Sequence, residues 1–558
     1  MVKKKILKNN ENEDSLVFLY TNKFYENKIS FIKYAIIKKY DKRKGNRMKK
    51  ALPIGIFDYN ELQTSGYYVV DKTLMIKDFL EIKAKGTLIT RPRRFGKSLN
   101  MSMLVEFFDI TKDSKDLFKD TQIFETNYAS EMNQYPTIFL SFANAKGDKD
   151  LIIKALKHEI MKEYHRYLFL FDSLSNRMDK KKYDDLLQND DIVEALHFLI
   201  EMLEKYYSKK VMVFIDDYDT PFIEAHIKGF YEEIKEPLVS LFNELFTSTS
   251  SKHVLLMGMQ VFEKENLESV NICTVKDHDY DQYFGFTKEE TKALLEYYEL
   301  ELNGEVNRMY DGYHLRKDAL YNPLSITHYA SKQALDTYWL DSLSDTMIKA
   351  AIEKHNGSEF KQEFEFLVHY GYIDTNVELE VSFFEEDTMA SLWGLLVNAG
   401  YLTLVSNERI KIPNHELRKE MTRLVADHLG ISRSCIAMMC LNLISKDFEG
   451  FIKDYQFFYK NLKDKKEYAA MELILCAALS NKYNVVCREG NGLMLLIDKK
   501  DNELAYVLVF KYFEDASKDE LSRIAQEIVT SLCDSPKNVV IALVHQDKDV
   551  VIKVNGPC

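Results

Sequence analysis

The sequence predicts an α/β protein whose first folded unit is a doubly wound parallel sheet. Between about residues 51 and 260, short apolar runs alternate with longer stretches in which apolar residues recur at helical spacing. Short, wholly apolar runs are typical of strands buried on both faces, as in a parallel sheet. The predicted strands are 87–90, 137–142, 211–215 and 253–258.

Helices are predicted between these strands. After residue 98, Leu99, Met103 and Phe107 recur at spacings of four, which places them on one helical face. Two further helices are predicted at 151–170 and 192–207. In a sheet built from alternating strands and helices, ligands bind beyond the carboxyl ends of the strands. Functional residues are therefore expected directly after the predicted strands.

The segment Arg-Pro-Arg-Arg-Phe-Gly-Lys-Ser, residues 91–98, follows the first predicted strand and opens a helix. Its last three residues match the end of the phosphate-binding pattern G-x-x-x-x-G-K-[ST], in which main-chain N–H groups and the lysine bind phosphate and the hydroxyl binds Mg²⁺. Arg91 replaces the first glycine, which normally permits a tight turn near the phosphates. The predicted nucleotide-binding residues are Arg91, Arg93, Arg94, Phe95, Gly96, Lys97 and Ser98.

Two of these arginines are open to a second interpretation. Arg93 and Arg94 could bind phosphate oxygens directly, because a guanidinium group matches that geometry. They could equally be solvated or paired with acidic neighbours.

Two carboxylates follow the predicted strand 211–215. Asp216 at the strand end would hold Mg²⁺ together with Ser98. Asp217 stands where many such enzymes carry a glutamate that polarises the attacking water, and it is the predicted catalytic residue. Its side chain is one methylene shorter, which puts its reach to that water in doubt. The competing interpretation of residues 216–219 is an acidic turn after a core strand.

Composition limits the class of protein. The chain has 558 residues, 46% of them hydrophobic and 29% charged, which fits a soluble protein of several domains. It has neither a long apolar run for a membrane span nor the pattern of a secretory signal. Seven scattered cysteines without a C-x-x-C pair indicate free thiols, so a cytoplasmic location is expected. A net charge of −12 argues against a generally basic nucleic-acid-binding surface.

The chain divides into five predicted parts. Residues 1–47 are an N-terminal extension, and the basic run at 38–50 favours a solvated tail. The predicted parts after it are a nucleotide-binding core at 48–261, a helical lid at 262–345, a winged-helix-like module at 346–439 and a second α/β unit at 440–558. Within the lid, Thr287 and Glu290 have the spacing of a helix capping box. In the last part, strands are predicted at 483–487, 493–498, 504–511, 538–544 and 549–554, with a helix at 517–533.

Several motifs resemble one known family. The run at 91–98, FIDDYDTPF at 214–222, LYNPLSI at 320–326 and WGLLVNAGYLT at 393–403 resemble the AAA-ATPase-like family of P-loop proteins. The resemblance extends from about residue 50 to the C-terminus. It implies an ATP-binding domain of the AAA/STAND type, using ATP and Mg²⁺, followed by a nuclease-like domain of the PD-(D/E)XK superfamily. Arginine at the first glycine position is usual in this family, so Arg91 is no departure from it.

The sequence departs from the family pattern at the ATP site. The usual Asp-Glu pair is Asp216-Asp217, and the arginine expected just after the strand 253–258 is Val261. Loss of an arginine that stabilises the transition state costs on the order of 10³ or more in rate. The resemblance therefore implies a protein that binds ATP and hydrolyses it slowly, if at all.

The nuclease-like domain departs further. Leu495 and Val509 replace the aspartate and glutamate that hold the divalent metal in the family, and neither can bind Mg²⁺. Asp498 is a weak candidate to replace the lost carboxylate. We therefore expect an inactive nuclease-like fold, kept for packing, dimerisation or contact with DNA.

The leading hypothesis is a nucleotide-dependent switch in which the lid closes over ATP and shifts the C-terminal parts. Its expected partners are ATP and either a second copy of the chain or another protein. Binding to a membrane is not expected. One alternative is an ATP-controlled DNA-processing nuclease, against which Leu495 and Val509 argue. The other is a non-enzymatic scaffold that uses both degenerate sites only for fold stability.

Overall fold

The computed structural model describes residues 49–555 apart from 173–176, 268, 315–318, 340–341, 355–359, 361–362, 365, 368–370, 407, 429–432, 461–467, 480–481, 489–491, 501–502, 514–515, 533–538 and 547–549. The chain divides into two units, Met1–Ala51 and Leu52–Cys558. The predicted N-terminal extension, 1–47, lies outside the described residues. The helices and strands named in this section belong to the second unit.

The first sheet is parallel and has five strands in the order β2-β3-β4-β1-β5. The four predicted strands are confirmed. The fifth strand, β5, was not predicted, and it lies in the range assigned to the lid. The strands are β1 Gly86–Thr90, β2 Thr137–Ser141, β3 Val211–Asp216, β4 Ser251–Gly258 and β5 Val270–Cys273.

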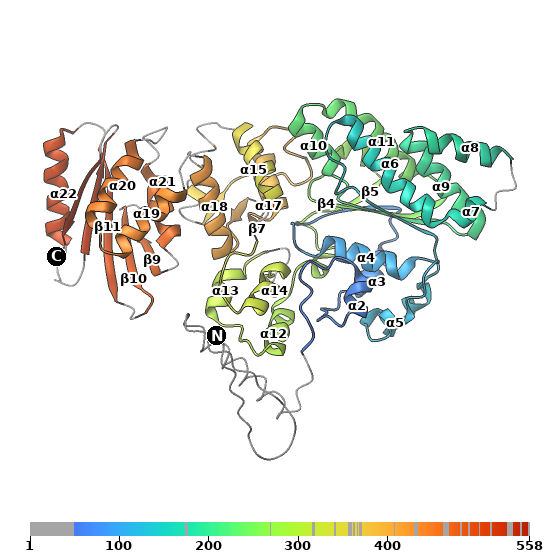
Figure 1. The fold of residues 1–558 in the computed structure, drawn as a ribbon, viewed down its shortest axis with the longest axis horizontal. Helices are drawn as coiled ribbons and strands as arrows, with labels where there is room; N and C mark the ends of the chain where they lie inside the picture. The colour runs from blue at the N-terminus through green and yellow to red at the C-terminus, as the bar shows by residue number, and fades with distance from the viewer. Residues whose placement is uncertain are drawn as a thin grey trace, which may run out of the picture. The chain divides into compact units, whose positions relative to one another are not determined.

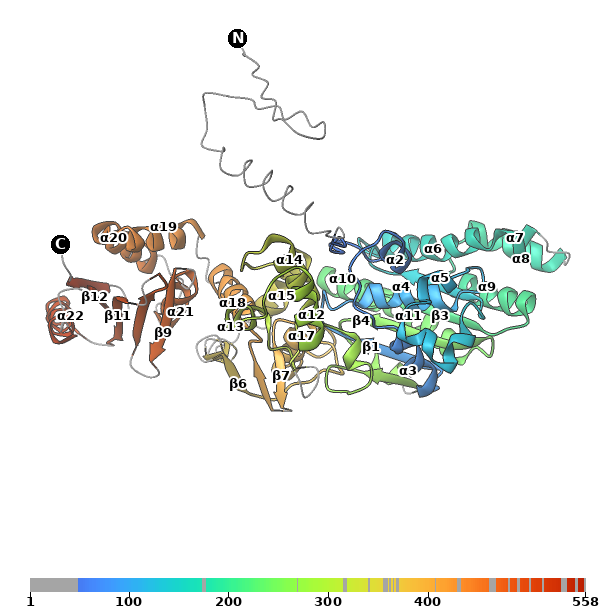
Figure 2. The same cartoon turned by 90° about the horizontal axis from the view of Figure 1, so that it is seen from below.

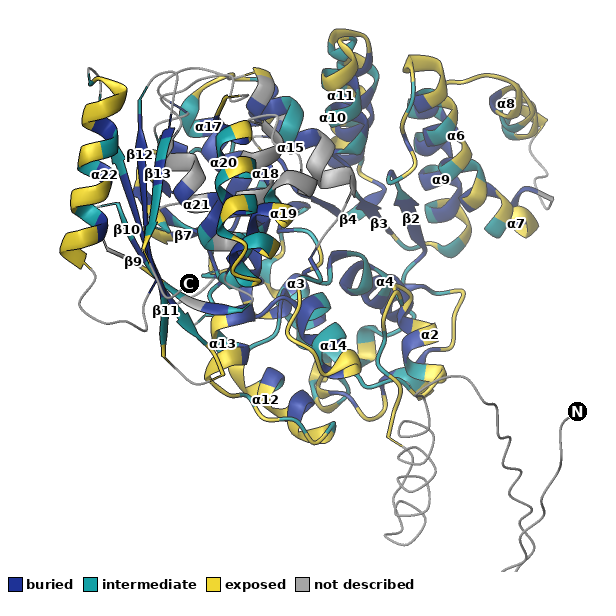
Figure 3. Ribbon diagram, turned by 60° about the vertical axis from the view of Figure 1, so that its left-hand side comes forward, coloured by how far each residue is buried: buried dark blue, intermediate teal, exposed yellow. Residues whose placement is uncertain are grey.

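Helices cover both faces of this sheet, as a doubly wound fold requires. Figure 1 shows α3 and α4 on one side and α6, α9 and α11 on the other. Every residue of β3 is buried, and Figure 3 shows β3 and β4 in the colour of buried residues. The helices of this part are α2 Tyr59–Thr64, α3 Leu74–Ile82, α4 Lys97–Phe108, α5 Lys115–Phe118, α6 Lys149–Arg166, α7 Leu168–Asp172, α8 Arg177–Gln188, α9 Ile192–Tyr207, α10 Thr220–Lys228 and α11 Tyr231–Thr247.

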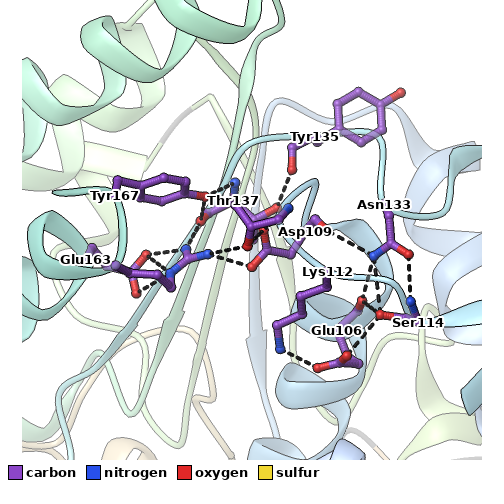
Figure 4. A network of polar contacts seen from close by, with 11 residues as sticks. Glu106, Asp109, Lys112, Ser114, Asn133, Tyr135, Thr137, Glu163 and Tyr167 are labelled. Carbon is purple, nitrogen blue, oxygen red and sulfur yellow. Dashed lines mark hydrogen bonds and ion pairs between the residues drawn. The ribbon is translucent and has the colours of Figure 1, made fainter. Parts of the chain in front are cut away.

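A polar network joins the C-terminal end of α4 to α6 and to the start of β2 (Figure 4). The Arg166 guanidinium contacts the Asp109 carboxylate at 2.6 Å and the Glu163 carboxylate, and it donates to the Thr137 carbonyl. The Tyr167 hydroxyl donates to the same carbonyl at 2.9 Å. The polar groups of these residues satisfy one another, so the network holds the helices at the amino end of the strands, opposite the edge where a ligand would bind.

The described residues of the predicted lid include the short α-helices α12 Lys288–Tyr297, α13 Gly304–Tyr310 and α14 Pro323–Lys332. The predicted capping box is confirmed: the Glu290 N–H donates to the Thr287 hydroxyl at 3.2 Å, and the Thr287 N–H donates to the Glu290 carboxylate at 2.8 Å. These helices enclose a small apolar cluster of their own that includes Leu294, Val306 and Ile326.

The next part combines helices with a small antiparallel sheet of order β6-β8-β7. The predicted strand pair near 401–412 is confirmed as β7 and β8. The elements are α15 Ser342–Lys354, β6 Tyr372–Asp374, α17 Met389–Ala399, β7 Thr403–Ser406, β8 Arg409–Lys411 and α18 His415–His428. Gly394 in α17 is required for close packing, because a Cβ there would lie 1.7 Å from the Glu378 carbonyl oxygen.

The C-terminal part is a mixed sheet of order β13-β12-β11-β10-β9, in which only β11 and β12 are parallel. Figure 2 shows α22 on one face of this sheet and α19 to α21 on the other. The predicted strands and the helix are confirmed within a residue or two. The elements are α19 Arg433–Ile444, α20 Phe448–Lys460, α21 Tyr468–Leu479, β9 Tyr483–Arg488, β10 Leu493–Asp498, β11 Leu504–Tyr512, α22 Lys518–Leu532, β12 Val539–His545 and β13 Val550–Asn555. Among the helices described, none is long and apolar enough to cross a membrane.

Candidate nucleotide-binding site

The loop at 91–98 connects the carboxyl end of β1 to the first turn of α4. Two of its residues are in the left-handed region, Arg94 at φ +65° and Gly96 at φ +90°. Arg91 is not among the described residues with positive φ, so the glycine normally found there is not required for this turn. The backbone therefore explains why an arginine is tolerated at this position.

The Arg91 side chain is fully buried and donates to main-chain carbonyls at the ends of β1 and β5 and in the chain after β5. One terminal nitrogen donates to the carbonyls of Thr90, Cys273 and Thr274 at 2.8 to 2.9 Å, and the other donates to that of Asp279 at 2.7 Å. Burial lowers the pKa of Arg91 to about 10, which leaves it charged at neutral pH. Arg91 thus fastens the loop to the chain that follows β5. Its predicted contact with nucleotide stays a prediction.

Lys97 opens α4 with its ammonium group turned back toward the loop. Its Nζ donates to the carbonyls of Arg91 at 2.9 Å and Pro92 at 3.1 Å. Burial lowers the pKa of Lys97, while the charges of Asp217 and Asp216 raise it. The loop carbonyls therefore hold a cation at the N-terminus of the helix, beside the carboxylates at the end of β3.

Ser98, in the first turn of the helix after β1, and Asp216, at the end of β3, lie close together although β1 and β3 are not neighbouring strands. The order β3-β4-β1 puts one strand between these two elements, yet Ser98 lies close enough to Asp216, beyond the sheet edge, for its hydroxyl to lower the pKa of the Asp216 carboxyl group. Burial, and then the charge of Asp217, raises the pKa of Asp216 to about 7, while the Ser98 hydroxyl opposes this rise. The two stretches that the sequence predicted to converge therefore do so.

This oxygen pair fits Mg²⁺, which prefers hard oxygen ligands and keeps several waters. Within the described part of the chain there is no group of three or more His, Cys, Asp or Glu side chains that could hold a metal ion by themselves. A Mg²⁺ ion on Ser98 and Asp216 would therefore need phosphate oxygens and water for its remaining positions. Such a site is suited to a metal–nucleotide complex more than to a free ion.

The residues after Asp216 fasten the end of β4. Both the Met259 and Gln260 N–H groups donate to one Asp219 carboxylate oxygen at 2.8 Å. The Tyr218 hydroxyl donates to the Gln260 carbonyl at 2.7 Å. Sequence reasoning assigned roles to Asp216 and Asp217, kept an acidic turn as the competing interpretation of residues 216–219, and gave no role to Tyr218 or Asp219. The only signal was an aromatic and a second aspartate directly after Asp216-Asp217, which does not name the partners.

Asp217 and Val261 stand at the two positions where the sequence departs from the family pattern at the ATP site. Asp217 is half-buried and takes a left-handed conformation at φ +51°, and its N–H donates to the Asp216 carboxylate at 3.1 Å. Val261, at the position where the family resemblance expects an arginine, is fully buried and apolar. It brings no positive charge to the site.

The remaining loop residues are placed differently from one another. Arg93 is half-buried, and its charge lowers the pKa of Lys97, whereas Arg94 is exposed. The ring of Phe95 is buried against Tyr313 of the lid, with ring centroids 4.8 Å apart and an interplanar angle of 76°. Phe95 is thus a packing residue in this arrangement, and nucleotide contacts of all three residues stay predictions.

The C-terminal sheet carries apolar residues where the resemblance expects metal ligands. Val509 is buried in a cluster between the sheet and α22, and Leu495 packs against the same cluster. Asp498 follows Leu495 by three residues, so strand alternation puts it on the other face, with Leu496. Glu489, part of the same family motif, lies outside the described residues.

Comparison with known proteins bears on the first sheet and its loop. Residues 53–268 match the model of the AAA-ATPase-like family, described as predicted AAA-ATPase. That range contains the loop at 91–98 and the carboxylates after β3. The match supports a nucleotide-binding, ATPase-like role.

Two similar proteins cover more of the chain. One is described as an uncharacterized protein in the vnfD 5′ region of Azotobacter chroococcum mcd 1; it is 23% identical over 445 residues, which are 74% of this chain and 78% of that protein. The other is the solved structure of the Walker-type ATPase PABY2304 of Pyrococcus abyssi, with 15% identity, a TM-score of 0.36, and coverage of 67% of this chain and 99% of that one.

Proposed function

We propose that this protein binds ATP with Mg²⁺ and acts as a nucleotide-dependent switch. The observation that carries the proposal is the convergence of the first turn of α4 with the end of β3, where the Ser98 hydroxyl and the charge of Lys97 both lower the pKa of the Asp216 carboxyl group. Main-chain N–H groups and the dipole at a helix N-terminus favour a phosphate at this place. Lys97, Gly96 and Ser98 would hold the phosphates, and Ser98 and Asp216 the metal.

The switch is supported by contacts between the loop and later parts of the chain. Phe95 packs on Tyr313, and the Phe95 carbonyl accepts from the Gly285 N–H at 3.2 Å. Pro92 approaches Gly400 so closely that a Cβ on Gly400 would lie 2.9 Å from the Pro92 Cβ. A change in the loop on nucleotide binding therefore reaches the lid and the turn after α17 directly.

We further propose that hydrolysis is slow and that the C-terminal sheet is a nuclease-like fold without catalysis. The short Asp217 side chain and the buried Val261 support the first part. The apolar surroundings of Leu495 and Val509 support the second, because a metal cannot bind there. Metal-dependent cleavage of plasmid DNA by the purified protein would instead favour the nuclease hypothesis.

The test of binding is calorimetric titration of the full chain with Mg-ATP. Lys97→Ala removes the only side-chain cation in the first turn of α4, so we expect affinity to fall by at least tenfold, about 1.4 kcal/mol. Lys154→Ala, an exposed lysine of α6, is the matched control and should bind like wild type. Equal affinity of all three proteins would contradict the proposal, and no binding by any would favour the scaffold hypothesis.

The test of slow turnover is Asp217→Glu. The added methylene carries the carboxylate toward the attacking water. We therefore expect the rate of ATP hydrolysis to rise above that of wild type, by about tenfold to a hundredfold. Phosphate release under saturating Mg-ATP measures it, with the exposed Asp190→Glu as control. An unchanged rate would mean that carboxylate length does not limit the site.

A further inference from the structure

A pair of carboxyl groups joins the chain that follows β4 to the turn before α17. The Tyr231 hydroxyl of α11 bridges the Glu263 and Glu385 carboxyl groups: its oxygen lies 2.5 Å from Glu263 Oε1 and 2.7 Å from Glu385 Oε1. The Glu263 N–H also donates to Glu385 Oε1 at 2.9 Å. We call these three residues, Tyr231, Glu263 and Glu385, the carboxyl latch.

The number of protons in the latch decides its chemistry. Burial raises the pKa of Tyr231, so the phenol stays protonated and supplies one hydrogen. That hydrogen serves one carboxylate at a time, and two ionised carboxylates only accept hydrogen bonds. The Tyr231 oxygen is within hydrogen-bond distance of both carboxyl groups, so its second contact is a hydrogen bond only if that carboxyl group carries a proton and donates it to the phenol oxygen.

The surroundings place that proton on Glu385. The Lys235 ammonium lies 2.9 Å from Glu263 Oε1, so it stabilises the ionised form of Glu263 first. Burial is the largest influence on the pKa of Glu385, and the negative charge of Glu263 raises that pKa further. The latch is also shielded from water, because the His226 ring stacks on the Tyr231 ring with centroids 3.7 Å apart and contacts Phe262 and Phe384.

Other charged groups near the latch are paired on its rim. Lys264 binds Glu380, and Lys354 lies 3.6 Å from Asp387. Burial lowers the pKa of His226 to about 4, so its ring is neutral above pH 5. The titratable and charged groups from all elements packed here are His226 of α10, Tyr231, Glu232 and Lys235 of α11, Glu263 and Lys264 after β4, Lys354 of α15, and Glu378, Glu380, Glu385 and Asp387 before α17.

The backbone at Glu263 has a conformation that non-glycine residues disfavour, and the contacts of the latch help to hold it there. Glu263 has φ +56°, in the left-handed region that non-glycine residues seldom adopt. It lies three residues after Gln260, whose N–H is fixed by Asp219. The latch therefore closes the segment that runs from the candidate nucleotide site.

We propose that Tyr231, Glu263 and Glu385 form a proton-dependent latch that holds the chain after β4 to the turn before α17 and loosens as the pH rises to neutrality. This regulation is independent of the proposed nucleotide binding. It needs no ligand and would act on the full chain alone.

The direction follows from the Glu385 carboxyl group. Burial raises its pKa from 4.5 to about 7 in the closed latch. Between these values the closed form keeps a proton that an open form loses, so opening becomes about tenfold more favourable for each pH unit of increase. Above about pH 7 both forms are ionised and the dependence ends. The pKa of Glu263 is lowered, so this group affects opening of the latch only at pH values below about 4.5. It does not change the dependence expected between pH 4.5 and 7.

Hydrogen exchange of the full chain between pH 5.5 and 8.5, corrected for the intrinsic effect of pH, tests the latch. We expect protection of the amides at 261–264 and 382–386 to fall about tenfold per pH unit up to pH 7 and then to level off. Glu385→Gln keeps the hydrogen-bond donor and removes the titration, so its protection should stay high and flat.

Two controls separate the latch from general effects. Glu386→Gln changes an exposed neighbouring carboxyl and should keep the wild-type profile. Tyr231→Phe should lower protection of both segments at acid pH while β3 stays protected. A pH-independent wild-type profile, or the same slope in wild type and Glu385→Gln, would overturn the proposal; the wild-type profile decides even where a variant does not fold.

Discussion

At the scale of the residue, the candidate site is built from buried charges that are satisfied chiefly by main-chain groups. Arg91 and Lys97 donate to carbonyls, and Asp219 accepts from two N–H groups. A buried charge without such partners would be costly. Asp216 differs, because a hydroxyl and a neighbouring carboxylate face it and its pKa is raised to about 7. It is therefore the group of the site most sensitive to a bound cation.

Asp216 predicts the pH dependence of nucleotide binding. Mg²⁺ needs the ionised carboxylate, and the pKa of Asp216 without ligand is about 7. Below that value binding must first release a proton, so affinity for Mg-ATP should fall about tenfold for each pH unit below 7 and should be constant above it. Calorimetry in buffers of different ionisation enthalpy should show about one proton released near pH 6 and almost none near pH 8.

A control is needed because Glu385 titrates in the same range. Glu385→Gln removes the titration of the carboxyl latch and should leave the proton release on nucleotide binding unchanged. If the release vanished in that variant, or if the wild-type affinity did not vary between pH 6 and 8, Asp216 would not be the group that titrates.

At the scale of the element, strongly patterned segments were predicted well and marginal ones were not. Helix α9 and strand β10 have the predicted bounds, because each is a long or unbroken apolar pattern with clear ends. Strand β5 was missed because it has four residues and contains Asn271. It is a strand only because β1 pairs with it.

The predicted helix 151–170 is in fact two helices, and the break has a tertiary cause. Helix α6 ends at Arg166, whose side chain is held by Asp109 and Thr137, and the Tyr167 hydroxyl binds the main chain of Thr137. None of these partners is near in sequence. The spacing of apolar residues within the segment cannot reveal a helix break that is caused by residues distant in the sequence.

In the candidate site, as in the helices and strands, the sequence predicted the local features and not the contacts between distant residues. The pattern of a strand, a Gly-Lys-Ser turn and a helix, with aspartates after a second strand, is local and gave Lys97, Ser98 and Asp216. Three of the carbonyls that accept hydrogen bonds from Arg91 are more than 180 residues away in the sequence. They belong to Cys273, Thr274 and Asp279. Such long-range contacts depend on the strand order, which the sequence does not state.

At the scale of the whole molecule, the loop at 91–98 is also a packing surface for the lid and for the turn after α17. The Phe95 ring lies on Tyr313, and the Tyr313 hydroxyl donates to the Gly400 carbonyl at 3.1 Å. Gly400 in turn meets Pro92, whose carbonyl accepts from Lys97. These contacts form a closed ring from the phosphate-binding loop through the lid to the end of α17 and back. Two sites joined in this way affect each other reciprocally.

Tyr313→Phe tests this ring of contacts. A phosphate that draws Lys97 weakens its bonds to the loop carbonyls, and so it works against the packing of Pro92 on the Gly400 turn. Removing the Tyr313 hydroxyl loosens that turn, so we expect Mg-ATP to bind about fivefold more tightly, the lower end of ordinary coupling between sites. Tyr310→Phe is the matched control, since it also loses a hydroxyl bond, to the Asp336 carbonyl at 2.9 Å, but within the lid. Equal dissociation constants for wild type and both variants would show that the loop does not communicate with the lid. Tighter binding in Tyr313→Phe alone would establish that nucleotide and the Gly400 turn compete for the loop.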